Sequence, residues 1–115
     1  MISGDIMDKE LEEIAKRIED LDEEIAFNKV PSITSLLERL SYLVSTFLIN
    51  SRTAKERYLE PVTSILDLYD RASKETDVKI KLSYYEKLES ALVVLESIFT
   101  KEGFLIDDKK SKLAA

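Results

Sequence analysis

The sequence predicts an all-α protein, an up-and-down antiparallel helical bundle of three long or four medium helices. The 115 residues include only two glycines and two prolines, which leaves little material for the tight turns of a β-protein. Hydrophobic residues make up 44% of the chain and charged residues 35%, which is typical of helical bundles. The hydrophobic residues recur every three or four positions in long segments that short polar segments separate.

The first predicted helix covers about residues 5–27, and Asp5 or Ser3 is its expected N-cap. Its apolar residues keep a period of 3.5 residues for three heptads, and they are Met7, Leu11, Ile14, Ile18, Leu21 and Ile25. Two apolar positions per heptad form only a narrow stripe. We therefore expect this helix on the outside of the bundle or in a coiled-coil pair.

The segment Asn28–Ser32 predicts a break before the second helix, because Pro31 disfavours helix at Val30 and suits a first helical turn. Ser32, or a capping box formed by Ser35 and Glu38, is the expected start. A wide apolar face follows, made of Ile33, Leu36, Leu37, Leu40, Leu43, Val44, Phe47 and Leu48. A helix with so wide an apolar face should be central.

Residues 50–61 leave two interpretations open. The chain either turns near Asn50 and Ser51, with Thr53 and Glu56 as a second capping box, or continues as one helix with a kink at Pro61. We favour a break or a kink somewhere in 50–61. The apolar period then continues to Ala72.

The last predicted helix runs from about Val78 to Glu102, with Asp77 as its N-cap and Gly103 as its C-terminal stop. Its main apolar stripe is Leu82, Tyr85, Leu88, Leu92, Leu95 and Phe99. Further apolar residues widen this stripe, and they are Ala91, Val93, Val94 and Ile98. Phe104 is available for the contact that accompanies a glycine C-cap, and a short tail with Leu105 and Ile106 follows.

We expect one helical-bundle domain over residues 1–111, with residues 112–115 as a vector-derived tail. The longest uncharged run, residues 40–51, is shorter than the ~20 residues that a bilayer-spanning helix needs. The first ten residues lack the basic start and apolar core of a signal peptide. A cytoplasmic location without membrane contact is therefore expected, and the composition is thermophile-like.

The negative charge is concentrated in the first helix. Residues 1–27 contain ten acids and three bases, a formal −7, whereas the whole chain carries −6. This acidic face either keeps the protein soluble or contacts a basic partner through Glu12, Glu19 and Glu23.

The chain contains no His and no Cys, so it offers no Ser-His-Asp triad, no Cys-His dyad and no thiolate zinc site. We therefore expect that the protein is not an enzyme and that it binds no cofactor and no metal. One distant alternative remains, because acidic pairs three residues apart are similar to those of magnesium-dependent all-α nucleotide pyrophosphohydrolases. The pairs with this spacing are Glu10 and Glu13, Asp20 and Glu23, and Asp67 and Asp70. That resemblance implies hydrolysis of a nucleotide with bound magnesium.

The sequence best fits a non-catalytic interaction protein, an accessory subunit or adaptor of a larger intracellular assembly that acts by helix docking. The first candidate surface is the stripe of Leu11, Ile14, Ile18 and Leu21, which in a monomer would instead cover the protein's own second and fourth helices. The second candidate is an exposed patch of Tyr84 with Ile80, Val93 and Ile49. The third class of function is a self-associating bundle, for example a homodimer that forms through the first helix.

The alternative function is an accessory factor of a nucleic-acid-processing complex. Small helical subunits of this size occur in polymerase holoenzymes and in CRISPR surveillance complexes. The candidate phosphate contacts are Arg52, Lys55 and Arg57, the one local cluster of bases. Contact with nucleic acid is expected to be indirect, through the protein partner.

Overall fold

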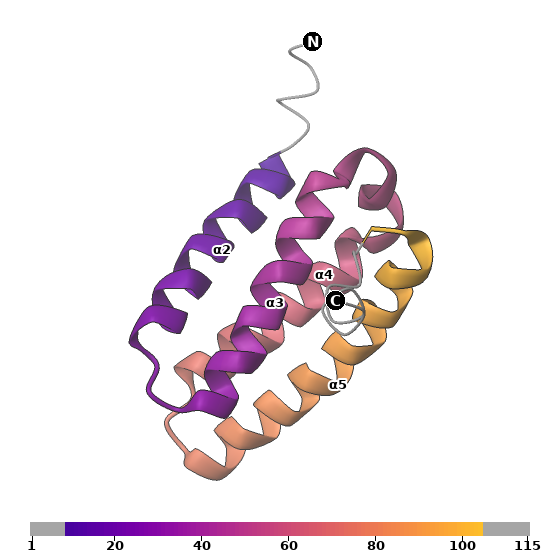
Figure 1. Cartoon of the computed structure of the whole chain (residues 1–115). Helices are drawn as coiled ribbons and strands as arrows, with labels where there is room; N and C mark the ends of the chain where they lie inside the picture. Colours follow the sequence, from indigo (N-terminus) through magenta and orange to yellow (C-terminus); the bar gives the residue numbers. More distant parts are fainter. Residues whose placement is uncertain (1–8, 105–115) are drawn as a thin grey trace, which may run out of the picture.

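The computed structural model describes residues 9–104, which form four α-helices. The helices are α2 (Lys9–Phe27), α3 (Pro31–Ile49), α4 (Ser51–Lys74) and α5 (Val78–Glu102). Consecutive helices run in opposite directions, so that α2 and α3 form one antiparallel hairpin and α4 and α5 form another (Figure 1). The fold is thus an all-α up-and-down bundle of four medium helices, as the sequence predicts. The expected caps Ser3 and Asp5, Met7 of the apolar stripe, and the tail with Leu105 and Ile106 lie outside the described residues.

α3 is central, because it packs against each of the other three helices. Its buried residues are Leu36, Leu37, Leu40, Leu43, Val44, Thr46 and Phe47. These side chains recur at the three- and four-residue spacing that keeps them on one broad face of the helix. The prediction of a central second helix is therefore confirmed.

The apolar stripe of α2 packs against α3. Leu11, Ile14 and Leu21 are buried in the core, and Ile18 and Ile25 are partly buried against it. The polar flanks of α2 reach α4 through two ion pairs, Arg17 to Asp67 at 2.9 Å and Lys55 to Glu10 at 3.5 Å.

The N-cap of α3 is Val30, two residues before the predicted cap Ser32 and five before Ser35. Val30 has an extended backbone, no side chain caps the helix, and Pro31 occupies its first turn. A proline here has no N–H group that needs a partner, and its fixed φ suits a helical start. The predicted caps Ser32 and Ser35 lie inside the helix, so that part of the prediction is wrong.

The break between α3 and α4 is a single residue, Asn50. Its side-chain amide donates to the Thr46 carbonyl at 2.9 Å, and its backbone N–H donates to the same oxygen at 3.0 Å. α4 then begins at Ser51 with no side-chain cap, so Thr53 does not form the predicted capping box. The Thr53 hydroxyl instead donates to the Asn50 carbonyl at 3.2 Å. The predicted break in 50–61 thus lies at its first residue.

α4 continues through Pro61 without ending. Proline has no N–H group to donate to the carbonyl four residues earlier, and its ring crowds that carbonyl, so the position costs helix stability. The helix continues because its apolar stripe is buried on both sides of this position, by Ala54 before it and by Val62 and Ile65 after it.

Both ends of α5 match the prediction. The Asp77 carboxylate accepts hydrogen bonds from the N–H groups of Lys79 at 2.9 Å and Ile80 at 3.2 Å. Gly103 has a left-handed backbone with φ of 83°, which glycine adopts without steric cost. The Phe104 N–H donates to the Phe99 carbonyl at 2.9 Å, and the two rings are in edge-to-face contact at 5.5 Å. These contacts form the glycine C-cap that the sequence indicates.

Two buried tyrosines, Tyr69 and Tyr85, lie near Glu24 at the C-terminal end of α2. Burial raises the pKa of the Tyr69 and Tyr85 hydroxyls, and the nearby Glu24 carboxylate raises both further. Each hydroxyl is therefore harder to ionise in the folded protein than in the unfolded chain, where its pKa is about 10.

These pKa shifts predict a loss of stability at high pH. As the pH rises above about 10, the unfolded chain releases protons that the folded protein retains, so the free energy of unfolding falls. A double Tyr69→Phe, Tyr85→Phe variant should show a smaller fall between about pH 9 and 11. Urea unfolding followed by circular dichroism at each pH measures this difference. Equal falls in the two proteins would contradict the prediction, because lysine titration is common to both.

Candidate protein-docking surface

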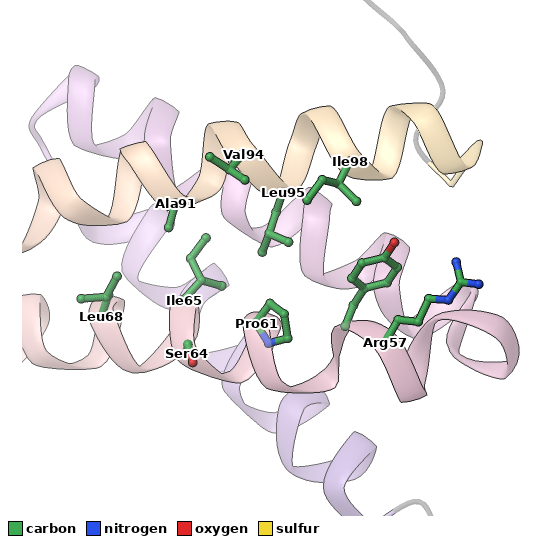
Figure 2. Close-up of a pocket in the computed structure, with 10 residues that line it drawn as sticks. Arg57, Pro61, Ser64, Ile65, Leu68, Ala91, Val94, Leu95 and Ile98 are labelled. Atoms are coloured by element: carbon green, nitrogen blue, oxygen red, sulfur yellow. The ribbon is translucent and has the colours of Figure 1, made fainter.

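A groove runs along the surface between α4 and α5. Figure 2 shows side chains of the two helices facing each other across it. Its volume is about 470 Å³, and its walls are mainly apolar. The lining residues are Arg57, Tyr58, Pro61, Ser64, Ile65, Leu68, Ala91, Val94, Leu95 and Ile98. We call this surface the α4–α5 groove.

Small side chains keep the groove open. Ile65 and Leu95 are buried beneath it, in the contact between the helices. The groove is also lined by Ser64 of α4 and Ala91 of α5. These two side chains are too small to close the space between the two helix backbones. The groove is therefore a direct consequence of residue size on two well-packed helices.

α5 leaves large apolar side chains exposed beside the groove. Val94 lines the groove and is 58% exposed, and Ala91 and Ile98 beside it are only partly buried, although five residues of α5 are already buried in the core. The sequence predicted more apolar surface on this helix than one stripe needs, and the structure confirms it. Exposed apolar side chains gathered at a hollow are typical of protein-binding surfaces.

One end of the groove is held by an aromatic and ionic cluster. The Glu102 carboxylate accepts hydrogen bonds from the Tyr58 hydroxyl at 2.7 Å and from the Arg57 guanidinium at 3.2 Å. The bond to Glu102 raises the pKa of the Tyr58 hydroxyl above its usual value. The Tyr58 ring also meets the Phe99 and Phe104 rings edge-to-face, at 5.2 and 6.2 Å. These contacts fix the distance between the two helices at this end.

The opposite side of α5 is held to α3. Arg39 donates to both carboxylate oxygens of Glu96, at 2.7 and 3.1 Å, and lies 3.6 Å from Glu89. The hydrogen bonds with Glu96 raise the pKa of the Arg39 guanidinium, although burial opposes the shift. This bidentate pair stabilises the orientation of α5 and so positions the groove on its other side.

The predicted residues of the first helix lie on two different sides of α2. Its apolar residues face α3 and are covered, with Leu11, Ile14 and Leu21 in the core. Glu12, Glu19 and Glu23 are exposed, and their spacing of seven and four places them along one outward line. An acidic outer face therefore exists, separate from the groove.

The predicted patch around Tyr84 is not one surface. Tyr84 is half-buried, with the Lys87 ammonium 5.8 Å from its ring centre, and it lies on the groove side of α5 with Ile80. Val93 is nine positions from Tyr84, which places it half a turn away around the helix. Ile49 ends α3, at the opposite end of the bundle from Ile80 (Figure 1). The expectation of a patch joining all four residues was wrong because it ignored these two separations.

The predicted phosphate cluster is divided between two sides of α4. Lys55 forms an ion pair with Glu10 of α2, whereas Arg57 pairs with Glu102 of α5. Arg52 is exposed and lies five positions from Arg57, which places the two on different faces of α4. Arg52 and Lys55 line one hollow together with two glutamates, whereas Arg57 lies apart from it at the α4–α5 groove.

The acidic pairs that resemble a magnesium site are partly used in ion pairs. Asp67 bonds to Arg17, Asp70 bonds to Lys74 at 3.1 Å, and Glu10 contacts Lys55. Within residues 9–104, no group of three or more potential metal-ligating side chains is close enough to hold an ion. In the same part of the chain, no helix has an apolar stretch that could cross a membrane.

Sequence reasoning missed the α4 side of the groove. It considered Pro61 only for its effect on the helix backbone, and it did not consider Ser64 and Leu68. The signal that could have revealed the groove is a second row of residues on each helix. The residues of this row recur at alternating steps of four and three, and the row is offset from the buried stripe.

Comparisons of the chain with protein-family models, with curated proteins and with solved structures found no match.

Proposed function

We propose that this protein is a non-catalytic helical interaction protein, an accessory subunit or adaptor that docks a partner protein on its helical surface. One observation carries the proposal: apolar side chains of α5 remain exposed along an open groove after the core is complete. Burying such surface on a partner would yield roughly 25 cal/mol per Å². The absence of His and Cys supports the non-catalytic part, because the commonest nucleophile and general-base pairs need them.

The test is capture of a partner by the tagged full-length protein from nuclease-treated extract of the source cells. We expect a protein partner in stoichiometric amount, because a nuclease-resistant complex is what helix docking would produce. Mass spectrometry with quantification of both chains measures the ratio. Recovery of the protein alone would contradict the proposed function.

A matched variant shows whether the acidic face of α2 takes part. Charge reversal of Glu12, Glu19 and Glu23 to lysine changes only exposed side chains. Loss of capture at unchanged thermal stability would assign the contact to that face. Unchanged capture would direct attention to the α4–α5 groove.

A second candidate is the nucleic-acid-associated factor. The observation that favours it is that Arg57 and Lys87 both border the α4–α5 groove or the hollow beside it, and Arg71 continues the line of Arg57. Binding to DNA or RNA at low salt, reduced when Arg57 is changed to alanine, would support this candidate. No measurable binding at low salt would remove it.

A further inference from the structure

Two parallel lines of residues border the α4–α5 groove. Each line has alternating steps of four and three, the spacing that keeps side chains on one strip of a helix. The line on α4 is Arg57, Pro61, Ser64, Leu68 and Arg71. The line on α5 is Lys87, Ala91, Val94, Ile98 and Lys101. Both lines are thus apolar or small in the middle and charged at the ends.

All four charged residues of these lines are basic. On each helix the two bases are fourteen residues apart, about 21 Å along the axis at 1.5 Å per residue. α4 and α5 are antiparallel, so Arg71 lies at the same end as Lys87, and Arg57 at the same end as Lys101. The groove therefore has a positive pair at each end.

Most of this positive charge is unused within the bundle. Arg57 contacts Glu102, but Arg71, Lys87 and Lys101 form no ion pair within residues 9–104, and all three are exposed. Glu86, on the outer edge of α5, is the other acid beside the groove. A ligand with carboxylates at its ends would give Arg71, Lys87 and Lys101 the acidic partners that they lack within residues 9–104.

Within the bundle, one helix already packs through an apolar stripe while one of its acids pairs with a base on another helix. α2 has a narrow apolar stripe that packs against α3, and its Glu10 pairs with Lys55 of α4. The α4–α5 groove offers a similar surface, an apolar strip between basic side chains, with no helix of residues 9–104 lying in it.

We propose that the α4–α5 groove docks an amphipathic α-helix of a partner protein, with small or apolar residues along a narrow stripe and carboxylates about fourteen residues apart. This inference rests on the proposed function and specifies its partner. Helix-in-groove recognition suits the observed dimensions, because an apolar helix stripe fills the centre and acids reach the basic ends. The carboxylates set the register of the helix in the groove.

The centre of the groove favours a helix over a nucleic acid. Pro61, Leu68 and Val94 provide no hydrogen-bond donors for phosphates or bases. The one aromatic side chain lining the groove, Tyr58, packs its ring against Phe99 and Phe104 and bonds its hydroxyl to Glu102. Base stacking needs an available aromatic face.

The test uses two labelled synthetic helical peptides with the full-length protein. Both peptides carry the same stripe of leucine and alanine, flanked by glutamate in one and by lysine in the other. Fluorescence anisotropy should show binding of the glutamate peptide at least about tenfold tighter than the lysine peptide, with the difference shrinking at high salt. Equal affinities, or no binding of the glutamate peptide, would overturn the proposal.

Two neighbouring valines provide the matched variants. Val94→Glu places a charge in the groove, whereas Val93→Glu places the same charge about 100° farther around α5, outside the groove lining, at similar exposure, 49% against 58%. We expect the first to weaken glutamate-peptide binding at least about tenfold and the second to change it less than about twofold, with equal melting temperatures. Equal weakening by both variants would overturn the proposal.

Charge reversal at the ends gives a second readout that does not alter the apolar centre. The double variant Arg71→Glu, Lys87→Glu should weaken binding of the glutamate peptide and strengthen binding of the lysine peptide. The reason is that the charge at one end of the groove changes from positive to negative. A labelled single-stranded RNA that binds the wild type more tightly than the glutamate peptide, and loses binding in this variant, would assign the groove to nucleic acid. A dimer in light scattering that Val94→Glu converts to a monomer would assign the groove to a second copy of the chain.

Failure of this inference is distinguishable from failure of the proposed function. If the Val94→Glu variant still captures a stoichiometric partner, the proposed interaction function is supported, but the groove is not the docking site. Recovery of the protein alone, together with no binding of the glutamate peptide, would reject both.

Discussion

Replacing Phe47 with alanine is expected to lower the free energy of unfolding by about 3–5 kcal/mol, a large part of the roughly 5–15 kcal/mol that stabilises a typical domain. Phe47 is fully buried on the central helix α3, which packs against all three other helices. Removing its ring leaves a cavity that close-packed neighbours cannot fill. Urea unfolding and a melting temperature lower by more than about 10 °C would report the loss.

Ile49→Ala is the matched control for this prediction. Ile49 lies on the same helix, two residues later, but its side chain is 82% exposed. Its replacement should change the free energy of unfolding by less than about 0.5 kcal/mol. A similar loss in both variants would mean that the Ile49 side chain is covered in solution.

The residues that punctuate the helices explain why so much of the fold could be predicted. Pro31, Asp77 and Gly103 act locally, through φ, side-chain capping and a left-handed backbone, so their effect can be recognised without tertiary structure. The apolar periods of α3 and α5 similarly identify their buried faces. Asn50 was harder, because a single residue turns the chain there and no glycine or proline marks the turn.

The surface was predicted less well, because spacing along one helix does not say which neighbour a side chain meets. Leu82 continues the buried stripe of α5 in the sequence, yet it is exposed near the start of the helix. Lys55 and Arg57 are two residues apart and pair with acids on different helices. The groove itself needs two helices at a fixed distance, so no single segment contains it.

The chemistry that the sequence excludes is independent of the fold. A chain without His or Cys cannot assemble the corresponding dyads, triads or thiolate sites, whatever its helices do. The acidic pairs behave differently, because their function depends on what faces them. Asp67 and Asp70 face Arg17 and Lys74, which gives both carboxylates a structural contact.

Replacing Leu21 with alanine is the second prediction with a large expected effect. Leu21 is fully buried where α2 packs on α3, so its loss should lower the free energy of unfolding by about 2–5 kcal/mol. Glu19→Ala, two residues earlier on the exposed face, should change it by less than about 0.5 kcal/mol. Chemical denaturation of the two variants measures both values under the same conditions.

The Leu21 variant also separates the two functions considered for the stripe of α2. If the stripe only covers the protein's own core, stability falls while capture per folded molecule stays unchanged, because no α2 residue lines the α4–α5 groove. If the stripe instead serves an external partner, capture falls and stability stays close to the wild type. The burial of Leu11, Ile14 and Leu21 leads us to expect the first result. A stable Leu21 variant that no longer captures its partner would mean that α2 leaves the bundle to bind.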